Sequence, residues 1–128
     1  MNKEHIVRIA GFVAAIILLS TLYFKFTGHP ESVELFSKLG VEPWGRWATG
    51  ILELIASLML FVRRTSGLAA LMGAGIMVGA IASHLLIIGI DTNGDGGDLF
   101  YMAIAVFVCC AFVVLNRIDD LKSLLGKK

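Results

Sequence analysis

The chain has 128 residues, of which 57% are hydrophobic and only 16% are charged, and its net charge is +1. A soluble domain carries about 25% charged residues and a disordered chain is poor in apolar ones, so both classes are excluded. The charge balance gives no indication of a basic surface for nucleic acid. Charged residues are absent from residues 9–24, 66–90 and 99–116, and Glu53 is the single one within 47–62. Four apolar blocks separated by short polar segments predict a protein that crosses the lipid bilayer four times.

Each apolar block is expected to be helical, because lipid offers no hydrogen-bond partner to backbone N–H and C=O groups. We therefore predict an all-α fold, a bundle of four transmembrane helices in a single membrane domain over residues 1–128. Crossing ~30 Å of hydrocarbon takes about 20 residues, which places the spans at about residues 9–26, 44–62, 67–90 and 99–115. The first block is too long for a signal-peptide core and is followed by Leu22-Tyr23-Phe24 rather than small residues, so we expect a retained span.

The segment Thr27–Pro43 is the one connection long enough for structure of its own. Pro30-Glu31-Ser32 resembles a helix start, and Gly40 is a natural stop. Val33, Phe36 and Leu39 recur at helical spacing between them. The pattern predicts a short amphipathic helix at the outer membrane interface.

Lys and Arg residues are distributed unequally between the two sides of the predicted spans. If the N-terminus is inside, the inner side holds eight of them and the outer side three. The eight are Lys3, Arg8, Arg63, Arg64, Arg117, Lys122, Lys127 and Lys128, and the three are Lys25, Lys38 and Arg46. The excess of inner positive charge predicts that both termini, including the polar tail 116–128, are cytoplasmic.

Glu53 is the most informative residue, because it lies about nine residues into the second span. An ionised carboxylate at that depth costs ~2.5 to 3.5 kcal/mol and must be paired, protonated or hydrated. Arg46, Gly50, Glu53 and Ser57 share one helical face, which predicts a polar stripe toward the bundle. Two interpretations remain open: a ligand or proton-handling site, and a structural hydrogen bond between helices.

Three further polar residues lie at the outer ends of the other predicted spans. His84 is in the third span, where it serves either as a packing residue or as a partner of Glu53 or of a ligand. Lys25, at the end of the first span, either extends to the interface or completes a charge-balanced triad with Glu53 and His84. Tyr101 could add a hydroxyl from the fourth span. These residues, with Arg46 and Ser57, form the candidate ligand-binding set.

Other motifs in the chain predict no catalytic or metal site. The loop 91–96 matches the first half of a calcium loop, but Met102 occupies the position where a bidentate Glu is required. Gly75, Gly79 and Ser83 form a small-residue ridge that would let a neighbouring helix approach closely. The adjacent Cys109 and Cys110 lack the spacing of a dithiol centre and are expected to pack in the fourth span.

Several sequence elements resemble the DoxX family of bacterial membrane proteins. They are Gly28-His29-Pro30, the run from Leu39 to Arg46, Thr49 to Leu54 with its Gly-x-x-Glu element, Met77 to Leu85 with Ala-x-x-Ser-His, and Asp95 to Phe100. The resemblance covers about residues 9–115. It implies a four-helix protein of the bacterial inner membrane, linked to redox and thiol-stress complexes. Lys25, Glu53 and His84 match polar positions of the family pattern, which carries no catalytic role to transfer.

Three functions are consistent with these observations. The first is a small accessory subunit that binds a quinone or another small hydrophobic molecule in the polar pocket. No cofactor-binding motif is present, so electron transfer would need a quinone or a redox partner protein. The second is a structural or assembly role, in which the polar groups join helices and the outer loop docks a partner. The third is transport of a small solute or protons, for which four short spans would need to form a homo-oligomer or enclose a polar path.

Overall fold

A computed structural model describes residues 2–91 and 96–126, and this part of the chain is helical with no strand. The main helices are α1 (Lys3–Thr27), α2 (Pro30–Lys38), α3 (Trp44–Leu60), α4 (Ser66–Ser83), α5 (Asp98–Asn116) and α6 (Ile118–Gly126). A 3₁₀ turn, η1 (Arg63–Thr65), leads into α4, and a π-helical turn, η2 (His84–Ile88), follows it. The centre of the predicted acidic turn, residues 92–95, lies outside the described residues.

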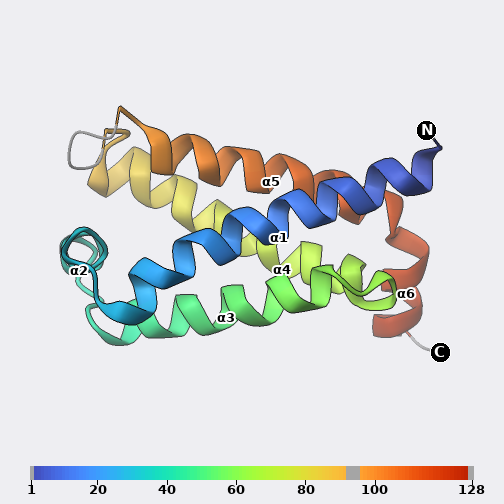
Figure 1. Cartoon of the computed structure of the whole chain (residues 1–128), viewed down its shortest axis with the longest axis horizontal. Helices are drawn as coiled ribbons and strands as arrows, with labels where there is room; N and C mark the ends of the chain where they lie inside the picture. The colour runs from blue at the N-terminus through green and yellow to red at the C-terminus, as the bar shows by residue number, and fades with distance from the viewer. Residues whose placement is uncertain (1, 92–95, 127–128) are drawn as a thin grey trace.

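The long helices α1, α3, α4 and α5 lie side by side, and consecutive ones run in opposite directions (Figure 1). α1 packs against α3 and α5, and α4 packs against the same two helices. The short helices α2 and α6 cross opposite ends of this arrangement, and α6 lies at the end that carries both termini (Figure 1). The tail predicted as a polar extension is therefore largely helical.

Three helical segments are long and apolar enough to cross a membrane: Lys3–Thr27, Arg63–Ile88 and Asp98–Asn116. They correspond to three of the four predicted spans, although the third ends at Ile88 rather than at residue 90. α3 has 17 residues, which gives a length of about 25 Å at ~1.5 Å per residue. Its role as the fourth span remains a prediction.

Alanine is the commonest residue of the buried core, whereas many large apolar side chains face outward. Leu86, Leu115 and Ile16 are 81%, 71% and 60% exposed. Soluble proteins rarely present such a surface, whereas lipid solvates it, and small residues let helices approach closely. The buried core consists of Val7, Ala14, Ala15, Leu18, Leu60, Ala69, Ala70, Met77, Ala103, Val106, Cys110 and Val113.

The closest approach to α4 occurs on a different face from the predicted small-residue ridge. A Cβ atom at Gly75 or Gly79 would have no neighbour within 4 Å among the described residues, whereas one at Gly73 would lie 2.9 Å from Cys110 Sγ. The expectation that Gly75 and Gly79 receive a neighbouring helix is therefore wrong within this chain. Cys110 is fully buried against Gly73, as the packing interpretation of the cysteines predicted.

Candidate functional site

Lys25 and Glu53, two of the predicted site residues, meet between α1 and α3. Lys25 Nζ lies 3.0 Å from Glu53 Oε1, and the two side chains are 15% and 4% exposed. Lys25 belongs to the last turn of α1, and Glu53 lies near the middle of α3. The carboxylate that the sequence singled out is thus paired with a cation from another helix.

Two glycines allow the chain to bring this pair together. Gly50 is one turn before Glu53, and a Cβ atom there would lie 2.9 Å from Cε1 of Phe26. The absence of a side chain lets the end of α1 pack directly on α3. Gly28 ends α1 in the left-handed conformation with φ +71°, which glycine adopts without steric cost. Phe26 therefore packs against α3, and the backbone turns toward α2 at Gly28.

The pair is electrically compensated but not fully hydrogen-bonded. Lys25 Nζ donates a hydrogen bond to Thr21 Oγ1 at 3.3 Å. The same ammonium lies 3.0 Å from Glu53 Oε1, within reach of a charge-assisted hydrogen bond, and no other donor is close to this buried oxygen among the described residues. A carboxylate oxygen can accept more than one hydrogen bond, so Glu53 Oε1 retains acceptor capacity beside Lys25.

Arg46 and Ser57 share the helical face of Glu53, but their polar atoms bind elsewhere. Arg46 donates through Nε and Nη2 to the Glu42 carboxylate, at 2.8–3.1 Å, and through Nη1 to the backbone carbonyl of Lys25. Ser57 Oγ donates to the backbone carbonyl of Glu53 at 2.6 Å. Arg46 therefore fixes the end of α1 beside α3, and Ser57 contacts the backbone of Glu53 rather than its carboxylate.

His84 and Tyr101 form a separate group at the junction of η2 and α5. His84 is buried, and its Nδ1 lies 3.0 Å from the carbonyl oxygen of Gly89. Because a carbonyl oxygen only accepts, Nδ1 is the donor in this contact. The His84 ring packs edge-on against Phe100 at 5.6 Å, and Phe100 packs against the exposed Tyr101 at 5.6 Å.

The predicted triad is therefore assembled in part. Lys25 and Glu53 are in contact, whereas no hydrogen bond or ion pair joins His84 to either of them within the described residues. The prediction also missed Thr21 and Glu42, which bind Lys25 and Arg46. Both missed partners lie four residues before the cation they bind, Thr21 within α1 and Glu42 in the turn before α3, and this spacing was the signal available in the sequence.

The apolar exterior, the three membrane-capable helices and the charged pair between helices define an all-helical membrane protein with a polar site inside its bundle. The chain belongs to the DoxX-like family, whose sequence model matches residues 9–115. This match confirms the resemblance seen in the sequence. No curated protein and no solved structure matches the chain significantly.

Proposed function

We propose that this DoxX-like protein is a small accessory subunit of a redox or thiol-stress system in the bacterial inner membrane. In this proposal it binds a quinone or another small hydrophobic molecule beside Lys25 and Glu53. The observation that supports it is the buried Lys25–Glu53 ion pair, in which the Lys25 ammonium is the one donor close to Glu53 Oε1 among the described residues. Ionisable groups inside a membrane bundle are costly and commonly mark functional sites.

The proposal takes residues 1–128 as one membrane domain with four spans, the fourth being α3. Its 17 residues are at the lower end of the length that crosses a bilayer, about 17 to 25 residues. Both termini are cytoplasmic, and α2 is an amphipathic helix on the outer face. Phe36, the buried residue of α2, supports this placement because it gives the helix an apolar side toward the bundle.

The chemistry of the pair fits both oxidation states of a quinone. The Lys25 ammonium can donate to a quinone carbonyl, and Glu53 Oε1 can accept from a quinol hydroxyl. A bound quinone would supply two-electron redox chemistry, which these side chains do not provide. The chain's own residues hold the ligand, compensate charge and exclude water. A redox partner protein or a second copy of the chain would complete the electron path.

The test is mass spectrometry of protein purified gently from membranes, followed by titration of a ubiquinone analogue into detergent-solubilised protein. We expect a co-purifying hydrophobic molecule, saturable quinone binding and loss of binding in Glu53→Gln. Glu34→Gln, an exposed carboxylate on α2, is the matched control and should bind as the wild type does. The ligand proposal fails if no molecule co-purifies and Glu53→Gln alters neither binding nor stability.

A structural role is the second candidate, because the site also joins elements of the fold. Arg46 binds both the backbone carbonyl of Lys25, at the C-terminal end of α1, and the Glu42 carboxylate. The ion pair of Lys25 with Glu53 links α1 to α3. In that case Glu53→Gln would lower folded yield or complex recovery while no ligand is found. Ligand binding therefore distinguishes the two functions. In both cases Glu34→Gln should behave as the wild type does.

A further inference from the structure

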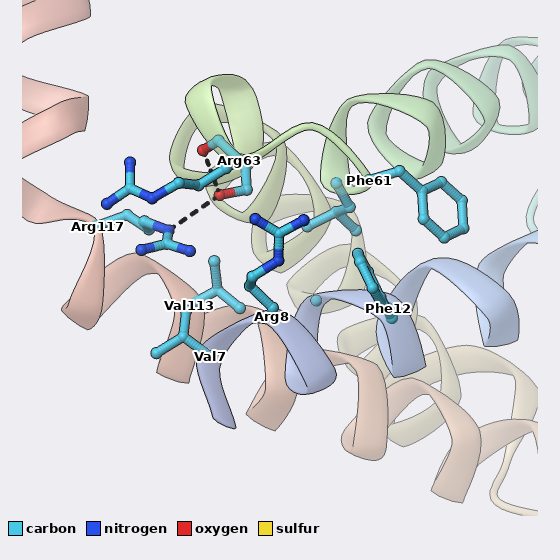
Figure 2. A pocket seen from close by; sticks show the side chains of 10 residues that line it. Val7, Arg8, Phe12, Phe61, Arg63, Val113 and Arg117 are labelled. Carbon is cyan, nitrogen blue, oxygen red and sulfur yellow. Dashed lines mark hydrogen bonds between the residues drawn. The ribbon is translucent and has the colours of Figure 1, made fainter. Parts of the chain in front are cut away.

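The end of the bundle that carries both termini has a crevice bordered by arginines. Figure 2 shows Arg8, Arg63 and Arg117 around one opening, with Phe12 and Phe61 on its other side. The apolar part of the lining comes from α1, α3 and α5. It consists of Val7, Gly11, Phe12, Leu60, Phe61 and Val113.

A wider hollow adjoins this crevice and shares three of its lining residues. The crevice itself is narrow, with a volume of about 10 Å³, whereas the hollow has about 530 Å³. Val7, Arg63 and Arg117 border both spaces. Lys3 lines the wider hollow, which opens between the start of α1 and the junction of α5 with α6. Four basic side chains therefore border the two spaces, against the carboxylates of Glu4 and Asp119.

Two of the four basic side chains at this end of the bundle belong to no ion pair within the described residues. Arg117 donates to both Glu4 carboxylate oxygens, at 2.7 and 2.9 Å. Arg63 pairs with Glu4 at 3.4 Å and with Asp120 at 3.0 Å. Arg8 and Lys3 have no ion pair within the described residues. Arg8 instead lies over the Phe12 ring, 5.7 Å from its centroid, with its guanidinium in the crevice (Figure 2).

The apolar side of the crevice continues onto the outer surface of the bundle. The rings of Phe12 and Phe61 pack together at 5.4 Å, and Phe61 is 38% exposed. Ile9 and Leu58 present further exposed apolar surface on the same two helices. A cation thus borders an apolar surface at the end of the predicted spans, which is the depth of phospholipid phosphates. A free anion would bind the cation but would make no contact with the apolar side chains of Phe12 and Phe61.

We propose that the phosphate headgroup of an anionic phospholipid binds at the mouth of this crevice, where it meets the wider hollow, with Arg8 as the main donor and Lys3 and Arg63 contributing charge. The acyl chains lie along Phe12 and Phe61. Guanidinium groups bind phosphate through paired hydrogen bonds, and basic pockets between spans recognise anionic lipids. This lipid site is separate from Lys25 and Glu53, so it does not depend on the proposed quinone function.

The test is native mass spectrometry of the full chain in detergent, with phosphatidylglycerol or phosphatidylcholine added at equal concentration. We expect preferential retention of phosphatidylglycerol and a loss of about fivefold in that preference for Arg8→Gln. Arg64→Gln is the matched control, since Arg64 is exposed and does not line the crevice. Arg8→Lys should retain part of the preference, because it keeps the charge and loses the planar fork.

The remaining outcomes overturn the proposal. Equal retention of both lipids, or unchanged preference in Arg8→Gln, would show that Arg8 does not select the headgroup. Displacement of phosphatidylglycerol by inorganic phosphate alone would identify a free-anion site instead of a lipid site. Circular dichroism of each variant establishes that it is folded. Should Arg8→Gln fail to fold, Arg8→Lys tests the paired hydrogen bonds of the guanidinium, and an unchanged preference in that variant would show that Arg8 is not the main donor.

Discussion

Burial of Glu53 depends on Lys25, because no other cation is in contact with its carboxylate among the described residues. Removing one member of a buried pair leaves an uncompensated charge, which costs more than removing both. The Thr21 hydroxyl holds Lys25 in place by a hydrogen bond at 3.3 Å. The pair is therefore a coupled unit of α1 and α3, and its energetics are testable by a double-mutant cycle.

We expect Lys25→Met to lower the free energy of unfolding by about 3–5 kcal/mol. Lys25→Met combined with Glu53→Leu should recover most of that loss, since neither charge is then buried. Unfolding in detergent, followed by circular dichroism, measures both effects. Lys38→Met, which removes an exposed lysine from α2, should stay close to the wild type. A double variant less stable than Lys25→Met would contradict the coupling.

The sequence predicted which residues need partners more accurately than it predicted the partners. A lone carboxylate in an apolar helix must be compensated, and Lys25 was the nearest candidate cation at the outer end of α1. Arg46 and Ser57 lie on the face of Glu53, yet closer partners satisfy them: the Glu42 carboxylate and a backbone carbonyl one turn away. The helical period predicts which side of a helix a residue faces, but it does not predict which of the neighbouring groups on that side it binds.

At the scale of helices, the contact between α4 and α5 passes over Gly73 and Cys110. We expect Gly73→Ala to destabilise the protein by about 1–3 kcal/mol, because the added methyl group overlaps the Cys110 sulfur. Gly75→Ala is the matched control: it lies in the same helix with open space around its Cβ position. It should be neutral or gain up to about 1 kcal/mol from helix propensity.

Thermal unfolding of the two glycine variants and of Gly73→Ala/Cys110→Ala completes this test. The double variant should regain stability, because removing the sulfur makes room for the methyl group. Equal losses in Gly73→Ala and Gly75→Ala would show that the open face of α4 is also packed, and would contradict the arrangement described above.

Charge-free stretches predicted the apolar helices well because lipid requires both an apolar surface and a hydrogen-bonded backbone. They did not predict where polar ends continue as helix. α1 begins at Lys3, six residues before the predicted span, and the tail forms α6. They also gave no signal for the π-helical turn at His84, where the imidazole binds the Gly89 carbonyl.

For the molecule as a whole, Glu4 and Arg117 join the first turn of α1 to the residue after α5. Arg117 is buried, donates to both Glu4 oxygens and donates through Nε to Ser66 Oγ at 3.2 Å. No local spacing relates residues so far apart in the chain, so this contact was not predictable from the sequence. It connects α1, α4 and α5 at the polar end of the bundle.

This connection predicts a pH dependence of stability. The hydrogen bonds and charge of Arg117 lower the pKa of Glu4, which precedes the apolar stretch of α1, from 4.5 to about 2. The contribution is fully present above the unfolded pKa of 4.5, and it is lost as the pH falls from there through about 2. Thermal unfolding of Glu4→Gln should vary less with pH over that range than the wild type. Glu34→Gln should follow the wild type, and a Glu4→Gln profile that parallels the wild type would contradict the assignment.

The proposed orientation of the whole molecule, with both termini cytoplasmic, rests on the unequal charge of its two ends. Ser123, near the C-terminus, and Ser37, on α2, are exposed positions at opposite ends of the bundle. With both termini cytoplasmic, a membrane-impermeant maleimide should label Ser37→Cys in bacterial cells whose inner membrane is intact. Ser123→Cys should react only after the membrane is disrupted. The wild type, whose Cys109 and Cys110 lie within α5, provides the background for subtraction. The reverse labelling pattern would invert the topology, and labelling of both positions on the same side would show that the chain crosses the membrane an even number of times between them, which would contradict three spans in α3, α4 and α5.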